Sequence, residues 1–207
     1  MALCCTVLGA GSWGTALAVQ LAQQGHQVKL WDRNPERCEA ITENRKNPHY
    51  LTEIDLPENI QACASLANSF AGAQLVVGVV PSHGLGAVWA QAREHIQDGA
   101  VICCASKGIE DTSLQTMYQV MQRELGHRFA QSLTVLSGPT FALELARGLP
   151  SAAVSAGPAE PAQAVADAFH GGAFRVYHTE DVTGVCVGGS IKNKDRTICT
   201  LPIITEI

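Results

Sequence analysis

Six residues near the N-terminus, GAGSWG at positions 9–14, constrain the fold more than any other part of the chain. They follow a short apolar run from Leu3 to Leu8, which is typical of a strand buried on both faces. Small and apolar residues then recur with the period of a helix over residues 14–22. A second strand-like run ends at Asp32. A strand, a glycine-rich turn, a helix and a second strand predict a βαβ unit of about 30 residues.

The three glycines of this turn have the spacing and the context of a dinucleotide-binding loop. Gly9 would permit the tight turn, Gly11 would let a pyrophosphate approach the backbone, and Gly14 would let helix and strand pack closely. Free N–H groups at the start of the following helix favour an anion there. The alternative is an ordinary glycine-rich turn between a strand and a helix.

The end of the second strand bears on which dinucleotide would bind. Asp32 lies where a carboxylate would accept hydrogen bonds from an adenosine ribose, whereas the adjacent Arg33 could pair with a 2′-phosphate. A solvated Asp–Arg pair at the start of a loop explains the same two residues about as well. The choice between NAD and NADP therefore stays open.

Strand-like and helix-like runs keep alternating as far as residue 178. Further strands are expected at residues 74–80, 100–105, 133–136, 152–155 and 174–177. Helices are expected at residues 37–44, 85–95, 114–125, 141–146 and 159–169, and from Val182 onward. This alternation predicts an α/β fold with a doubly wound, mainly parallel Rossmann-type sheet.

The composition argues for a folded chain and against several function classes. Lys and Arg number 14 against 19 Asp and Glu, so the formal net charge is −5, unlike that of a typical nucleic-acid binder. With 46% hydrophobic and 16% charged residues, disorder is not expected. No apolar run reaches the roughly 20 residues of a membrane span, and the N-terminus lacks a secretory signal. We therefore expect a cytoplasmic protein without a membrane span.

Neither the eight cysteines nor the seven histidines predict a metal site. The cysteines form no C-x-x-C motif, and the pairs Cys4–Cys5 and Cys103–Cys104 lie in strand-like runs, where neighbouring side chains point to opposite faces. The histidines are scattered singly. We expect reduced thiols that fill the core.

Polar residues follow several of the predicted strands, at the edge where open α/β sheets bind ligands. Lys107 could meet a phosphate or a carbonyl oxygen there, or be an ordinary solvated lysine. The segment from Gly138 to Thr140 offers backbone N–H groups and a hydroxyl. His83 lies at a similar edge, but a histidine that shapes the turn is the better interpretation. Near the C-terminus, Lys192 follows small residues on a helix, and its partial burial would lower its pKa and suit it to proton transfer.

Five segments, GAGSWGTALA, VPSH, ASKGIE, SGPTFALELARGLP and GVCVGGSIKN, resemble in order and spacing the bacterial NAD(P)-dependent glycerol-3-phosphate dehydrogenases. That family interconverts sn-glycerol 3-phosphate and dihydroxyacetone phosphate by hydride transfer, in the supply of glycerophospholipid precursors. The resemblance implies an oxidoreductase that uses NAD or NADP and, in the intact family, a homodimer. A ketopantoate reductase or a 6-phosphogluconate dehydrogenase-like enzyme is a weaker match, because of ASKGIE and GGSIKN.

The resemblance also implies roles for individual residues. Lys192 would be the catalytic lysine, the proton donor and acceptor at the carbinol oxygen. The cofactor would lie against the glycine turn and four other segments, at Gly9, Gly11, Ser12, Trp13, Gly14, Arg33, Tyr50, Lys107 and Ala142. The substrate would lie against Lys107, Gly138, Thr140 and Lys192. No metal is implied.

The similarity ends after Asn193. We expect residues 1–178 to form the NAD(P)-binding domain, residues 179–193 to begin the family's all-helical substrate domain, and residues 194–207 to be a tail outside the family pattern, as in a truncated chain. Two hypotheses follow. One is an active glycerol-3-phosphate dehydrogenase, and the other is an NAD(P)-binding domain without turnover.

Overall fold

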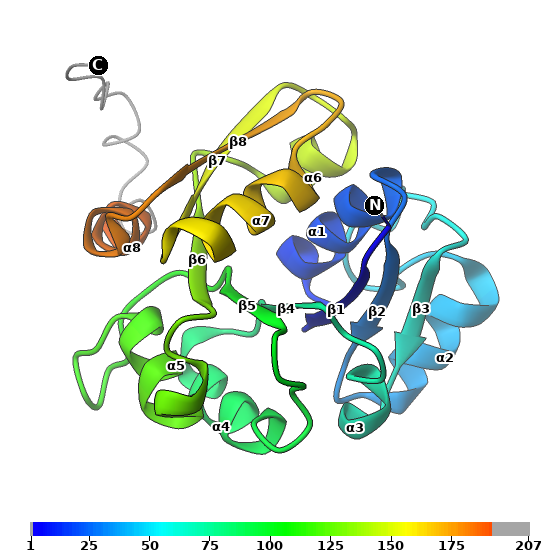
Figure 1. The fold of residues 1–207 in the computed structure, drawn as a ribbon. Helices are drawn as coiled ribbons and strands as arrows, with labels where there is room; N and C mark the ends of the chain where they lie inside the picture. The colour runs from blue at the N-terminus through cyan, green and yellow to red at the C-terminus, as the bar shows by residue number, and fades with distance from the viewer. Residues whose placement is uncertain (1, 192–207) are drawn as a thin grey trace.

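The computed structural model describes residues 2–191, and one sheet runs through this part of the chain (Figure 1). The strand order is β3-β2-β1-β4-β5-β6-β7-β8. The strands are β1 (Cys4–Leu8), β2 (Gln27–Trp31), β3 (Ile60–Cys63), β4 (Leu75–Gly78), β5 (Val101–Cys104), β6 (Leu133–Ser137), β7 (Ser151–Ala156) and β8 (Phe174–Thr179). Neighbouring strands are parallel, except that β6 and β7 are antiparallel.

Helices cover both faces of this sheet. They are α1 (Ser12–Gln23), α2 (Pro35–Asn44), α3 (Leu66–Ser69), α4 (Ser82–Ala92), α5 (Met117–Leu125), the 3-10 helix η1 (His127–Phe129), α6 (Ala142–Ala146), α7 (Ala159–Phe169) and α8 (Val182–Ile191). In Figure 1, α1, α6 and α7 lie on one side of the sheet, and α3, α4 and α5 lie on the other. One apolar core includes Leu17 and Phe169, and a second includes Trp89 and Met121. The doubly wound, mainly parallel sheet predicted from the sequence is confirmed.

The strand register brings the ends of the central strands to one level. Leu8 pairs with Trp31 on one side and with Gly78 on the other, and Gly78 pairs in turn with Cys104. The residues that follow these strands therefore lie along one edge of the sheet. We call it the carboxyl edge, and it is formed by the segments after β1, β2, β4, β5 and β6.

Three features of the fold were not expected from the sequence. The short edge strand β3 and helix α3 were missed, because only the first residue of β3 is fully buried and the strand has no apolar run. The antiparallel direction of β7 was also missed. The helix expected from Leu114 begins instead at Met117. Leu114 has a positive φ of 55° and is 78% exposed, so it belongs to the turn before the helix.

The seven cysteines within residues 2–191 are free thiols. Cys5, Cys103 and Cys104 lie in the core, as expected, but Cys4 is exposed. Cys103 and Cys104 lie at the buried end of β5, whereas Cys4 is the first residue of β1 and the one exposed position of that strand. No group of metal-ligating side chains occurs in the described part of the chain. Within it, no helix has both the length and the apolar character needed to cross a membrane.

Candidate functional site

The glycine turn between β1 and α1 opens the carboxyl edge. Gly9 has a positive φ of 119°, and a Cβ there would lie 3.1 Å from the carbonyl oxygen of Val79. A side chain on Gly14 would collide with the carbonyl oxygen of Gly9. A Cβ on Gly11, in contrast, would meet no atom within 4 Å. The fold itself requires glycine at the first and third positions, while the second faces open space that a ligand could use.

The first turn of α1 leaves its backbone donors available. Gly11 is the N-cap residue, no side chain caps the helix there, and the first turn contains no acidic residue. Ser12 is exposed and Trp13 is half-buried in this turn. Unpaired N–H groups and the positive end of the helix dipole favour an anion at this place.

Asn47 ties the glycine turn to the segment that carries Tyr50. Its fully buried side chain donates hydrogen bonds to the carbonyl oxygen of Ala10 at 2.9 Å and to Thr15 Oγ1 at 3.0 Å. Its Oδ1 accepts from the backbone N–H groups of His49 and Tyr50. Sequence reasoning missed Asn47, although an Asn-Pro dipeptide is a turn signal.

At the end of β2, Asp32 is paired with a residue that the sequence analysis did not single out. Arg37 Nη1 donates to Asp32 Oδ2 at 2.8 Å, and the side chain of Asp32 is only 8% exposed. The guanidinium of Arg37 lies 5.4 Å from the centre of the Tyr50 ring. Arg33, the arginine considered from the sequence, is exposed. Asp32, Arg37 and Tyr50 therefore form one group at the β2 end of the carboxyl edge.

Lys107, which follows β5, contacts two other segments in the middle of the carboxyl edge. Its ammonium donates to the carbonyl oxygen of Gly138 at 3.2 Å and lies 5.8 Å from the centre of the Trp13 ring. Three residues predicted from the sequence thus converge from three separate segments. Ser106 fixes the start of this loop, because its hydroxyl donates to the carbonyl oxygen of Val80 at 2.6 Å.

Other residues predicted from the sequence lie beside this group. Thr140 is buried, and its hydroxyl donates to the carbonyl oxygen of Ala152 in β7 at 2.7 Å, so that donor already has a partner in the protein. Ala142 is half-buried and begins α6. His83 is exposed in the first turn of α4. Lys192 lies outside the described residues.

A small cleft with a volume of about 20 Å³ lies between the loop after β5, the end of β6 and helix α8. Its lining includes Lys107, Ser137, Ser190 and the thiols of Cys104 and Cys186. Burial raises the pKa of both thiols above the usual value, so both are neutral near pH 7 and neither is an activated nucleophile. The charged group that the described residues bring to this cleft is therefore the ammonium of Lys107.

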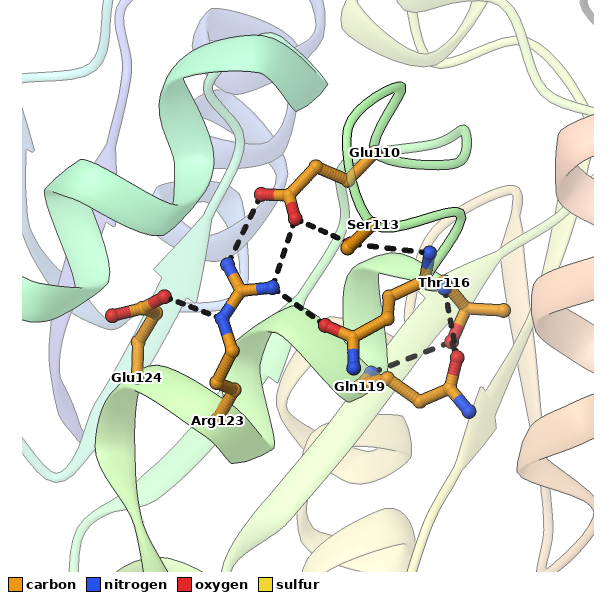
Figure 2. Close-up of polar contacts among 7 residues, drawn as sticks. Glu110, Ser113, Thr116, Gln119, Arg123 and Glu124 are labelled. Atoms are coloured by element: carbon orange, nitrogen blue, oxygen red, sulfur yellow. Dashed lines mark hydrogen bonds and ion pairs between the residues drawn. The ribbon is translucent and has the colours of Figure 1, made fainter.

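A cluster of polar contacts holds the loop that follows Lys107 (Figure 2). Arg123 on α5 donates to both carboxylate oxygens of Glu110, at 2.8 and 3.1 Å, and to the side chain of Gln115. The guanidinium of Arg123 and the hydroxyl of Ser113 lower the pKa of Glu110 to about 2. Thr116 and Gln119 close the first turn of α5 with a reciprocal capping box. Residues 110–116 are in this way fixed to α5.

Known proteins match this arrangement. Residues 4–163 match the family model described as the N-terminus of NAD-dependent glycerol-3-phosphate dehydrogenase. The chain belongs to this family. The resemblance drawn from the five sequence segments is thereby confirmed.

Curated relatives and solved structures agree with the family model. The chain is 45% identical to glycerol-3-phosphate dehydrogenase (NAD(P)+) of Anaeromyxobacter dehalogenans, over 91% of this chain and 57% of that protein. The same name and identity hold for a protein of Pseudoalteromonas translucida, over 91% of this chain and 56% of that protein. The crystal structure of glycerol-3-phosphate dehydrogenase from Coxiella burnetii superimposes with a TM-score of 0.85 at 34% identity, over 93% of this chain and 58% of that one. The chain thus spans little more than half the length of the relatives it matches.

Proposed function

We propose that this chain is a glycerol-3-phosphate dehydrogenase (NAD(P)+), which interconverts sn-glycerol 3-phosphate and dihydroxyacetone phosphate in the supply of glycerophospholipid precursors. One observation carries the proposal. The ammonium group of Lys107 contacts both Trp13 and Gly138. Trp13 is expected to bind the cofactor and Gly138 the substrate, so the two expected binding regions meet at this lysine. Family membership supports the same reading.

The carboxyl edge fits a dinucleotide. The open space at Gly11 and the unpaired donors of α1 suit a pyrophosphate, and the β2 end offers a carboxylate and a guanidinium for the adenosine ribose. The cofactor residues that we propose are Gly9, Gly11, Ser12, Trp13, Gly14, Arg33, Tyr50, Lys107 and Ala142. When bound, the nicotinamide would supply or accept the hydride.

The protein's part in the reaction is to bind, orient and polarise the substrate. Reduction of a ketone builds negative charge on its oxygen, and a nearby ammonium stabilises that charge. Lys107 fits this role or the binding of the substrate phosphate, together with the backbone of Gly138 and Thr140. We propose Lys192 as the group that donates the proton to the carbinol oxygen and accepts it in reverse.

The domain division and the partners are also proposals. We propose residues 1–178 as the NAD(P)-binding domain and residues 179–193 as the beginning of a helical substrate domain. The end of β8 at Thr179 and the start of α8 at Val182 support a boundary there. A homodimer and a cytoplasmic location stay predictions from the resemblance, and we expect no nucleic-acid partner.

Two measurements on the 207-residue chain test this function. The first titrates NADH and NADPH against the intrinsic tryptophan fluorescence, and we expect saturable binding of at least one of them. The second follows the absorbance of the reduced nicotinamide after dihydroxyacetone phosphate is added, and we expect consumption that depends on the substrate. Binding without consumption would favour the NAD(P)-binding domain without turnover. A folded chain that binds neither nucleotide would overturn both hypotheses.

A further inference from the structure

We propose that Arg37 is a specificity-determining residue for the dinucleotide. Its ion pair with Asp32 neutralises the carboxylate at the ribose end of the site, so that the 2′-phosphate of NADPH is accepted as well as the 2′-hydroxyl of NADH. The inference rests on the proposed function, because it names how that same site distinguishes between its two cofactors.

The Asp32 carboxylate is not free to act alone. Oδ2 accepts from Arg37 Nη1 at 2.8 Å, and Oδ1 accepts from the backbone N–H of Asn34 at 2.9 Å. Both oxygens therefore have a donor from the protein, and one of these donors carries a positive charge. A carboxylate in this position without such a partner favours ribose hydroxyls and repels a phosphate, because like charges interact strongly where water is partly excluded.

Arg37 is held in place from three directions. Its backbone N–H is bound by the side chain of Asn34, which caps α2, and its guanidinium contacts both Asp32 and the ring of Tyr50. The backbone of Tyr50 is fixed in turn by the buried side chain of Asn47. A guanidinium ordered before binding loses little side-chain entropy when an anion arrives, which favours phosphate recognition.

Arg33 differs from Arg37 in these respects. Arg33 is exposed, whereas the side chain of Arg37 is 21% exposed and pairs with the acid that would face the ribose. An exposed arginine contributes mainly long-range attraction, which salt screens. Arg37 changes the charge of the Asp32 site itself, and the two arginines can therefore be separated by experiment.

The test is a comparison of dissociation constants for NADPH and NADH in the 207-residue chain, by fluorescence titration. For Arg37→Gln we expect NADPH affinity to fall at least about tenfold, the effect of one lost charge-assisted contact, while NADH affinity stays within about threefold. Arg37→Lys keeps the charge and should retain most of the NADPH affinity. Arg93→Gln is the matched control, because Arg93 is exposed at the far end of α4.

A double variant separates charge from structure. If Asp32 repels the phosphate once Arg37 is gone, Asp32→Asn combined with Arg37→Gln should recover part of the lost NADPH affinity. A merely structural ion pair predicts no such recovery and equal losses for both nucleotides, and that result would overturn the inference. So would a wild-type chain that binds NADH but not NADPH, which leaves the proposed function intact. A wild-type chain that binds neither nucleotide overturns the proposed function first.

Discussion

Gly11 and Gly14 lie in the same turn, but the two positions differ in what a side chain would meet. Gly11→Ala places a methyl group in open space at a φ of −75°, which any residue adopts. We expect the free energy of unfolding to fall by no more than about 1 kcal/mol, because alanine is a poorer N-cap residue than glycine, while the affinity for either dinucleotide falls because the methyl group hinders the approach of the pyrophosphate. Thermal unfolding and cofactor titration of one sample measure both quantities.

Gly14→Ala provides the contrast. Its methyl group would collide with the carbonyl oxygen of Gly9, so the start of α1 must move away from the end of β1. Overpacking of this kind costs about 1–3 kcal/mol of stability. If Gly11→Ala destabilised the chain as much as Gly14→Ala, the open space at Gly11 would have no special relation to a ligand.

Asn47 connects elements rather than acting alone, because it joins the glycine turn to the segment that carries Tyr50. Replacement by alanine removes four hydrogen bonds and leaves backbone groups without this partner at a buried position. We expect Asn47→Ala to lower the free energy of unfolding by about 2 kcal/mol or more. Urea denaturation checks this value. Asn44→Ala is a suitable control. The side chain of Asn44 is exposed, and its hydrogen bond goes to the carbonyl oxygen of Ala40 in the same helix, so it joins no separate segments.

The contact between Glu110 and Arg123 joins the loop after β5 to α5, and it should make stability depend on pH. The pKa of Glu110 is lowered from 4.5 to about 2 in the folded chain, first by Arg123 and then by Ser113. A lowered folded pKa means that the stabilisation is complete above the unfolded pKa and is lost as the pH falls from about 4.5 towards 2. Glu110→Gln should therefore show a smaller loss of melting temperature over this window than the wild type.

The contrary result is equally clear. If wild type and Glu110→Gln lose melting temperature in parallel between pH 4.5 and 2, the ion pair makes no difference to folding. Glu36→Gln is a matched control, because Glu36 is exposed in the first turn of α2.

The elements that the sequence predicted well are those whose pattern is decided locally. Strands β1, β4 and β5 are buried on both faces, so their apolar runs are unambiguous. Strand β3 was not predicted, because an edge strand of four residues needs no apolar run. The antiparallel direction of β7 was not predicted, because it depends on the pairing of β7 with β6 and not on the composition of either strand.

The residues of the candidate site also fall into those that the sequence predicted and those that it did not. The glycine turn, Lys107 and Gly138 were predictable because each follows a strand end, and the topology gathers strand ends at one edge. Asn47 and Arg37 were not predictable, because their importance comes from partners in other segments or across a turn. Asn47 binds Ala10 from 37 residues away, and no local pattern signals such a contact.

At the scale of the whole molecule, the proposed ligand would cross the sheet from the β2 end to the loop after β5. It would thus contact several loops at once. Without the ligand, these loops are connected through the sheet and through side-chain hydrogen bonds such as that from Lys107 to the carbonyl oxygen of Gly138. A ligand that binds the folded chain and not the unfolded chain stabilises it by about 2.7 kcal/mol at a hundredfold excess over its dissociation constant. For a domain of this size that corresponds to a rise in melting temperature of roughly 5–10 °C. The measurement is thermal unfolding with and without NADPH, with adenosine as a control that lacks the pyrophosphate. Equal shifts with adenosine and NADPH would mean that the glycine turn contributes nothing, since in the proposed site only the dinucleotide would reach from Asp32 past Gly11 to Lys107.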